Sequence, residues 1–218
     1  MEHLKTVLDF FIHLDDHLSS IISTYGTTTY IILFAIIFIE TGLVIMPLLP
    51  GDSLLFAAGA FAYKGSLNIY VLLISLFVAA VLGDSLNYYL GKNFGLKVLR
   101  WKIGNRQLVR QEYLDKTHRF YEKYGAKTII IARFVPIVRT FAPFVAGIGE
   151  MHYGKFLSYN VIGGFIWVFG LTLLGYFFGT IPIVEKHFEL VILGIIFISV
   201  LPMIVEFVRH WVVRKELA

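Results

Sequence analysis

Four ionisable residues stand in apolar surroundings where a charge is costly. Glu40 interrupts the apolar run 30–46, and Asp52 directly follows the turn Pro-Leu-Leu-Pro-Gly that begins at residue 47. Arg133 and Arg139 lie inside a second apolar run, 128–149. An unpaired charge at the centre of a membrane helix costs about 2.5–3.5 kcal/mol on insertion scales. These residues must therefore pair with one another, face water or hold a ligand.

The residue types indicate a different role for the two arginines and the two acids. The planar, forked guanidinium groups of Arg133 and Arg139 suit phosphate oxygens, which predicts a phosphate-binding role. Desolvated carboxylates hold protons more readily, which predicts proton coupling by Glu40 and Asp52. The structural alternative is a salt bridge that only joins the two runs. The sequence leaves open which acid pairs with which arginine.

Composition indicates a membrane protein. Of 218 residues 57% are apolar and the mean hydropathy is +0.75, whereas soluble domains are about 45–50% apolar. The basic residues, which give a pI of about 9.2, cluster between and after the apolar runs, as in cytoplasmic loops. No nucleic-acid recognition module is visible, so no nucleic-acid partner is expected. Because cysteine is absent, disulfides and thiolate metal sites are excluded.

Two apolar runs are predicted to be re-entrant hairpins, at 30–63 and 128–149. Their arms are shorter than the roughly 20 residues that a spanning helix needs. Proline removes a helical hydrogen bond, and irregular backbone inside a membrane must be surrounded by protein or by a watery cavity. The residues expected at the tips are Pro47, Pro50 and Gly51 in the first hairpin and Pro136 and Pro143 in the second.

Full spans are predicted at 67–91, 156–179 and 188–208, and an amphipathic interfacial helix at 1–26. The basic segment 92–127, with a second amphipathic helix at 107–124, is placed in the cytoplasm by the positive-inside rule, and the C-terminus lies on the same side. The expected fold is an all-α polytopic membrane protein that forms one membrane domain, 1–218.

A short internal repeat supports a duplication. Phe-Ala-Ala-Gly at 56–59 matches Phe-Val-Ala-Gly at 144–147, and Tyr-Tyr-Leu-Gly at 88–91 matches Tyr-Phe-Phe-Gly at 176–179. Both matches have an offset of 88 residues. They predict two inverted-topology repeats, 28–91 and 128–180, each a re-entrant hairpin followed by a transmembrane helix. In such transporters the interrupted segments mark the binding site.

Four residues on the predicted spans are candidates for lining the transport pathway: Asp84, Asn87, Asn160 and Trp167. For Asp84 the alternative is a position near the lipid headgroups.

Two short motifs typical of enzymes or metal sites occur, but their positions in the chain argue against those functions. Residues 51–54, Gly-Asp-Ser-Leu, spell the serine motif of a soluble hydrolase class, but here Ser53 falls at a hairpin tip. His13 and His17 have zinc-helix spacing, but no third ligand is apparent. No enzyme activity, metal or cofactor is therefore expected.

Longer motifs, spread from about residue 2 to residue 209, resemble the DedA family, also called the SNARE-associated or VTT superfamily. They are Phe38-Ile-Glu40-Thr-Gly-Leu-Val, Leu49-Pro-Gly-Asp52-Ser, Gly83-Asp84-x3-Tyr88-x2-Gly91, Arg133-Phe-Val-Pro136-Ile-Val-Arg139-Thr-Phe-Ala-Pro143, Ala146-Gly147 and Asn160-Val-Ile-Gly163-x3-Trp167.

The resemblance implies a multi-pass protein of the bacterial inner membrane that flips polyprenyl phosphate, such as undecaprenyl phosphate, for envelope synthesis. It also implies that the family's essential acids and arginines fall at Glu40, Asp52, Arg133 and Arg139. Protons are the expected coupling ion, with sodium as the alternative. Membrane lipids are the expected partners, and the oligomeric state is left open, a homodimer included. The alternatives are a proton-coupled small-cation or drug antiporter, a phospholipid scramblase and a non-transporting scaffold.

Overall fold

A computed structural model describes residues 26–43, 51–100, 102–103, 106–107 and 111–182, together with the single residues 184, 191 and 194. The predicted interfacial helix at 1–26 and the predicted span at 188–208 fall almost wholly outside these residues. Pro47 and Pro50 of the first predicted tip lie outside them as well.

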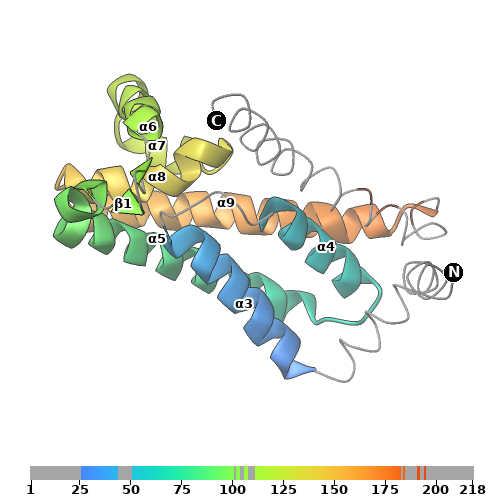
Figure 1. The fold of residues 1–218 in the computed structure, drawn as a ribbon. Helices are drawn as coiled ribbons and strands as arrows, with labels where there is room; N and C mark the ends of the chain where they lie inside the picture. The colour runs from blue at the N-terminus through green and yellow to red at the C-terminus, as the bar shows by residue number, and fades with distance from the viewer. Residues whose placement is uncertain are drawn as a thin grey trace, which may run out of the picture. The chain divides into compact units, whose positions relative to one another are not determined.

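The described residues are almost entirely α-helical, as predicted (Figure 1). A two-residue antiparallel ladder, with Lys102 opposite Gln107, interrupts the basic segment. The elements are α3 (Thr27–Gly42), α4 (Gly51–Tyr63), α5 (Ile69–Arg100), β1 (Lys102–Ile103), β2 (Arg106–Gln107), α6 (Gln111–Tyr124), the 3₁₀ turn η1 (Gly125–Lys127), α7 (Thr128–Ala132), α8 (Pro136–Ile148) and α9 (Tyr153–Gly179).

Among the described residues, two helices are long and apolar enough to cross a membrane. They are Ile69–Gly95 within α5 and Tyr153–Gly179, each of 27 residues, with mean hydropathy 2.2 and 2.0. At 1.5 Å per residue each is about 40 Å long, more than the roughly 30 Å hydrocarbon core. They coincide with the spans predicted at 67–91 and 156–179, although α5 continues to Arg100 into the predicted basic segment.

The segment 128–149 is broken where Pro136 predicts, but not at Pro143. The helix α7 ends at Ala132, Val135 is extended (φ −122°, ψ 102°), and Pro136 begins α8, where a missing N–H costs little. Pro143 was expected at the tip; instead it is buried inside α8, and the helix continues past it to Ile148. An interior proline removes the hydrogen bond to the carbonyl four residues earlier, which here is that of Arg139, and its ring crowds that carbonyl. The packing of α8 in the core outweighs this cost.

The chain divides into two compact units. Of the described residues, one unit contains 26–29, 51–72 and 171–182, and therefore the start of α3, all of α4 and the end of α9. The other contains the described residues from 30 to 43 and from 73 to 170, and therefore α6, α7, α8 and most of α3, α5 and α9.

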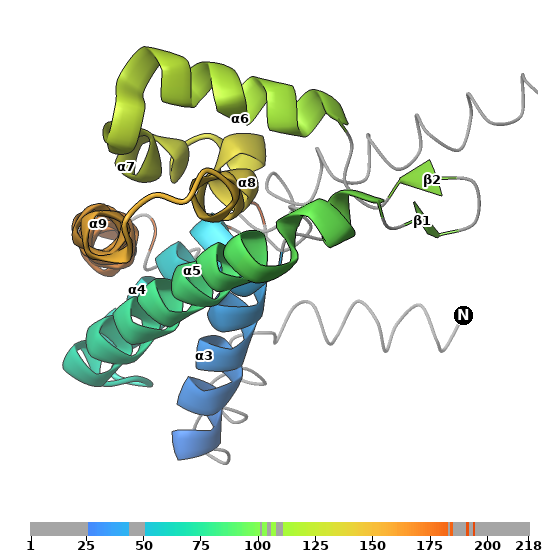
Figure 2. The ribbon, with the colours of Figure 1, turned by 90° about the vertical axis from the view of Figure 1, so that its left-hand side faces the viewer.

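In the larger unit, the amphipathic helix α6 covers α7 and α8 (Figure 2). The hydroxyl of Tyr121 donates to the carbonyl of Ala142 over 2.9 Å, and Thr128 Oγ1 donates to the carbonyl of Phe120 over 2.9 Å. Burial raises the pKa of the Tyr121 phenol well above its ordinary value, which keeps it a neutral donor. The helix α6 is thus fixed to the middle of α8.

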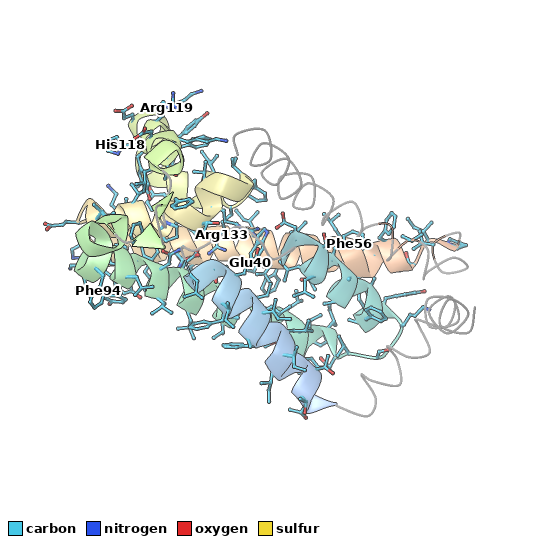
Figure 3. All side chains as sticks on the ribbon, viewed as in Figure 1. Glu40, Phe56, Phe94, His118, Arg119 and Arg133 are labelled. Carbon is cyan, nitrogen blue, oxygen red and sulfur yellow. The ribbon has the colours of Figure 1, made fainter. Side chains whose placement is uncertain are left out.

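Large apolar side chains project uncovered from the long helices and from α3 (Figure 3). On α5 the exposed residues Ile74, Val78, Leu82 and Leu86 recur every four positions and form a stripe along one face. In water such a stripe would cost about 25 cal/mol for each Å² exposed, whereas lipid tails solvate it without cost. These faces are suited to the hydrocarbon of a membrane.

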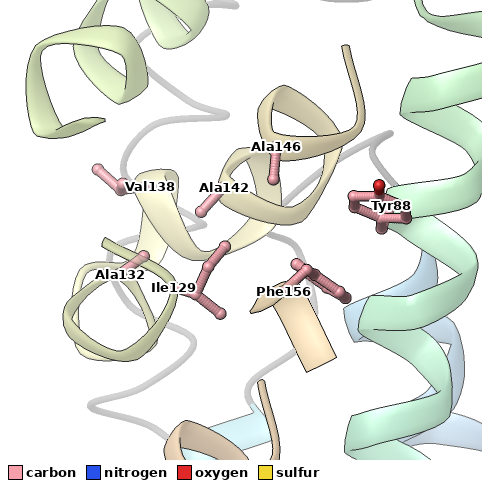
Figure 4. Packing of buried hydrophobic residues seen from close by; sticks show 7 residues of the cluster. All are labelled: Tyr88, Ile129, Ala132, Val138, Ala142, Ala146 and Phe156. Carbon is pink, nitrogen blue, oxygen red and sulfur yellow. The ribbon is translucent and has the colours of Figure 1, made fainter. Parts of the chain in front are cut away.

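The core of the larger unit joins α7 and α8 to the long helices α5 and α9 (Figure 4). Tyr88 of α5 stacks on Phe156 of α9, with ring centroids 4.6 Å apart, and donates its hydroxyl hydrogen to the carbonyl of Met151. Small and branched residues of α7 and α8 complete the cluster: Ile129, Ala132, Val138, Ala142 and Ala146.

Glycines allow α8 to lie directly against α5 in this unit. A Cβ atom placed on Gly147 would collide with the carbonyl oxygen of Tyr88, and one on Gly91 would collide with the carbonyl oxygen of Phe144. The two helices therefore touch backbone to backbone.

The smaller unit contains the same arrangement between α4 and α9. A Cβ on Gly59 would collide with the carbonyl oxygen of Thr172, and one on Gly175 would collide with the carbonyl oxygen of Phe56. Aromatic pairs flank this contact, with Phe56 near Phe178 at 5.3 Å between ring centroids.

The two glycine joints have the same form. Residues 56 and 59 on α4 take the places of 144 and 147 on α8, at the predicted offset of 88. On the long helices Tyr88 and Gly91 are replaced by Thr172 and Gly175, at an offset of 84, and not by residues 176 and 179 as the sequence match predicted. In each unit a short helix from one predicted hairpin packs on the long helix that follows the other. The inverted-topology repeat itself stays a prediction.

Replacing Gly147 by alanine is expected to lower the free energy of unfolding by about 1–3 kcal/mol, because the methyl group must push α5 and α8 apart. The matched control is Gly170→Ala, since nothing lies within 4 Å of a Cβ there. That control is expected to be neutral or to gain up to about 1 kcal/mol of helix propensity. Thermal unfolding in detergent measures both, and equal melting temperatures would contradict the joint.

Candidate functional site

Arg139 and Glu40 form a buried ion pair between two hairpin arms. Arg139 Nη2, from α8, donates to Glu40 Oε1, near the C-terminal end of α3. The side chains are 11% and 2% exposed. The two residues are 99 positions apart in the sequence, so the pair joins the first apolar run to the second.

Arg133 stands in the turn between α7 and α8 and makes a second pair. Its Nη2 donates to Asp84 Oδ2 of α5 and, over 2.5 Å, to Asn160 Oδ1 of α9 (Figure 3 labels Arg133 and Glu40). Arg133 and Asp84 are both almost fully buried. The sequence left Asp84 between the pathway and the headgroup region; the structure places it in the interior as the partner of Arg133.

Two glycines of α9 make room for the Arg133 guanidinium. A Cβ on Gly163 would lie 3.1 Å from Arg133 Cδ and Nε, and one on Gly164 would lie 3.4 Å from Nη2. Within the described part of the chain, Arg133 Nε and Nη1 are buried and make no hydrogen bond. Buried donors are nearly always satisfied, so these two nitrogens are suited to an additional acceptor.

Trp167 of α9 lies against both arginines. Its ring centroid is 5.6 Å from Arg133 Cζ and 4.9 Å from Arg139 Cζ, and the residue is buried. The negative face of an indole ring attracts guanidinium groups at such distances. Trp167, predicted as a pathway residue, therefore brings the two cations to one place.

The two predicted pathway asparagines are fully buried and act as braces. Asn160 Nδ2 donates to the carbonyl of Val81 over 3.1 Å, which holds the amide oxygen toward Arg133. Asn87 Nδ2 donates to the carbonyls of Thr41 at 3.1 Å and Thr140 at 2.9 Å.

The remaining predicted residues lie in the smaller unit or at a turn. Asp52 is exposed in the first turn of α4, and Gly51 is buried as its first residue. Pro136 begins α8, three residues after Arg133. The role of Asp52 in proton coupling stays a prediction.

The described residues of the site carry equal numbers of positive and negative charges. Two arginines face two carboxylates, Glu40 and Asp84, so the four formal charges sum to zero. Among the described residues, no group of three or more histidine, aspartate or glutamate side chains could hold a metal ion. The chemistry on offer is anion binding by guanidinium groups and proton exchange by carboxylates.

Comparison with known proteins identifies the family. A family model described as the VTT domain matches residues 49–177. Protein DedA of Escherichia coli is 52% identical over 212 residues, which cover 96% of each chain. The chain belongs to the DedA family.

Other DedA-family relatives are named as membrane proteins. An uncharacterized membrane protein of Mycobacterium leprae is 46% identical over 170 residues, 78% of this chain and 75% of that protein. The inner membrane protein YqjA of Escherichia coli is 34% identical over 165 residues, 72% of this chain and 71% of its own. No solved structure matches. The VTT match includes Asp84, Arg133, Arg139 and Trp167.

Arg133→Met is expected to destabilise this DedA-family protein by about 3–5 kcal/mol, because Asp84 would remain as an uncompensated buried charge. The double variant Arg133→Met with Asp84→Leu is expected to recover most of that loss, since no buried charge remains at that pair. Thermal unfolding of the purified proteins in detergent measures the difference. A double variant no more stable than Arg133→Met would show that the two residues do not depend on each other.

Proposed function

We propose that this DedA-family protein is a transporter that moves a lipid-linked phosphate across the bacterial inner membrane, with a polyprenyl phosphate such as undecaprenyl phosphate as the substrate. The observation that carries the proposal is the buried arginine pair. Arg133 and Arg139 meet at Trp167 among apolar helices, and Arg133 has two nitrogens with no acceptor in the described residues.

The arginines favour phosphate as the bound group. In this structure the carboxylates of Glu40 and Asp84 occupy positions that phosphate oxygens would take on the guanidinium groups. A phosphate presents more acceptor oxygens than one carboxylate, and forked guanidinium donors match its geometry. The additional donors of Arg133 therefore have a use when phosphate replaces a carboxylate.

The helix surfaces favour a substrate with a lipid tail. The outer faces of α5 and α9 expose large apolar side chains, which belong in hydrocarbon. A substrate whose phosphate enters the arginine site and whose isoprenoid tail stays in lipid needs no large water-filled channel.

Charge balance supports coupling to protons. The site is neutral without substrate, and a phosphate monoester brings roughly one to two negative charges. A net charge at that depth would cost about 2.5–3.5 kcal/mol per unit. Protonation of Glu40 or Asp84 restores neutrality and releases the arginine that the carboxylate had occupied. We therefore propose protons as the coupling ion, with sodium as the alternative.

The matched glycine joints support alternating access. Each short hairpin helix lies on a long helix through an equivalent backbone contact, so the two units present the same kind of packing. In inverted-repeat transporters, exchange of two such arrangements exposes a central site first to one side and then to the other.

Arg139→Ala is expected to reduce flipping of fluorescent undecaprenyl phosphate in proteoliposomes by at least about tenfold, because a charge-assisted contact to phosphate is lost. Arg139→Lys keeps the charge but not the forked pair of donors, so its flipping rate is expected to lie between those of Arg139→Ala and the wild type. Reconstitution levels are matched for all three proteins, and the melting temperature of each is measured so that a loss of fold is distinguished from a loss of phosphate contact. Flipping that persists at the wild-type rate in Arg139→Ala would remove the arginine from the mechanism.

The same vesicles separate the alternatives. Cation or drug flux that is lost in Asp52→Asn while lipid flipping persists would favour an antiporter. Flipping of ordinary phospholipids without any gradient would favour a scramblase. Wild-type function retained in Glu40→Gln or in Asp52→Asn would favour a scaffold.

Glu40→Gln is expected to uncouple lipid flipping from protons. The amide keeps the size of the side chain but cannot exchange a proton, so a pH gradient that accelerates wild-type flipping should leave the variant rate unchanged. A dye trapped in the vesicle lumen reports the proton flux alongside the lipid signal. Equal acceleration of both proteins by the gradient would assign the proton to another group.

A further inference from the structure

One amide joins both hairpin arms of the candidate site. Asn87 is fully buried in α5, and its Nδ2 donates to two backbone carbonyls, those of Thr41 at the end of α3 and Thr140 in α8. These acceptors are 46 and 53 residues from Asn87 in the sequence. Both hydrogens of the amide are therefore used between elements that local structure does not connect.

The two acceptors adjoin the ion pair. Thr41 follows Glu40, and Thr140 follows Arg139. An amide group is planar and its two hydrogens diverge at a fixed angle, so holding both carbonyls sets the separation of α3 and α8 at the level of the pair.

The packing beneath the amide leaves α3 little freedom. A Cβ on Gly83, one turn before Asn87, would collide with Thr41 Oγ1, and a Cβ on Gly42 would lie 3.4 Å from the carbonyl oxygen of Gly83. The end of α3 thus rests on α5, where Asn87 reaches it.

The amide oxygen of Asn87 shows that the residue is not there for packing alone. Within the described part of the chain, Asn87 Oδ1 is buried and makes no hydrogen bond. Burying an unsatisfied acceptor is unfavourable, and an apolar side chain of the same size would avoid it. The two donated hydrogen bonds are what the asparagine adds at this position.

We propose that Asn87 is a positioning residue of the phosphate site: it holds the backbone beside Glu40 and beside Arg139 in register, so that Arg139 can exchange the carboxylate for a lipid phosphate while α3 and α8 keep their separation. This inference rests on the proposed function. Asn87 acts through Arg139 and Glu40, because both of its donors are already engaged and its oxygen cannot bind an anion.

The first experiment measures the separation of the arms without any lipid substrate. The chain contains no cysteine, so spin labels can be placed on Ile39→Cys in α3 and Gly149→Cys just after α8, both at exposed positions. Asn87→Leu is expected to broaden the distance distribution between the labels. Thr172→Val, which removes a buried hydroxyl that makes no hydrogen bond, is the matched control and is expected to leave it unchanged.

The second experiment asks whether Asn87 acts through Arg139. Binding of fluorescent undecaprenyl phosphate in nanodiscs is expected to weaken about tenfold in Asn87→Leu, but by no more than about twofold when the same change is added to Arg139→Ala, because coupled residues are not additive. Asn87→Gln keeps the donors on a longer side chain, should shift both signals less, and serves if Asn87→Leu does not fold.

The outcomes separate the two proposals. Equal weakening of binding by Asn87→Leu in both backgrounds would overturn action through Arg139. An unchanged distance distribution would overturn the positioning role, whatever the substrate. Absence of lipid-phosphate binding by the wild type, with the distribution still broadened in Asn87→Leu, would overturn the proposed function and leave Asn87 as a brace of the ion pair alone.

Discussion

The cost of a charge in hydrocarbon organises the larger unit. Arg133, Arg139, Glu40 and Asp84 are all removed from solvent, and each unpaired charge would cost about 2.5–3.5 kcal/mol. Arg139 of α8 reaches a carboxylate on α3, and Arg133, just before α8, reaches one on α5. The helices α3, α5 and α8 must therefore meet at the same level. Trp167 and Asn160 bring α9 to the same level, through contacts to the guanidinium groups. A requirement of electrostatics thus fixes which helices are neighbours.

Small residues make that meeting possible. Without a side chain at Gly91 and Gly147, the backbones of α5 and α8 touch, and Gly163 and Gly164 leave the volume that the Arg133 guanidinium fills. Lipid does not drive apolar helices together as water does, so close backbone contact and buried polar contacts must hold them. The same residues therefore serve stability and the geometry of the candidate site.

Much of this could be predicted because the signals are local in the sequence. Long apolar runs gave the helices α5 and α9, and Pro136 gave the break before α8. Charges within apolar runs pointed to Glu40, Arg133 and Arg139, which the structure buries in ion pairs, while their functional roles stay predictions. The partner of Arg133 could not be deduced, since Asp84 lies 49 residues away on a helix whose rotation the pattern left undefined. The hydrogen bonds from Asn87 to two backbone carbonyls could not be predicted, because every residue has a backbone carbonyl. Pro143 was wrongly expected at a tip, because the sequence does not distinguish a proline inside a packed helix from one that ends a helix.

The position of Pro143 has a mechanical consequence. A proline in a helix lacks the amide hydrogen that would otherwise brace the carbonyl four residues before it, and helices bend most easily at such a point. In α8 that carbonyl belongs to Arg139, while the turn beyond Pro143 is anchored by Phe144, Ala146 and Gly147 against α5. The turn that carries Arg139 is therefore held less by the hydrogen bonds of its own helix than by its neighbours, through the contacts of Asn87 with Thr140 and of Tyr121 with Ala142. A side chain that must change partners is thus mounted on a turn whose rigidity comes from other helices.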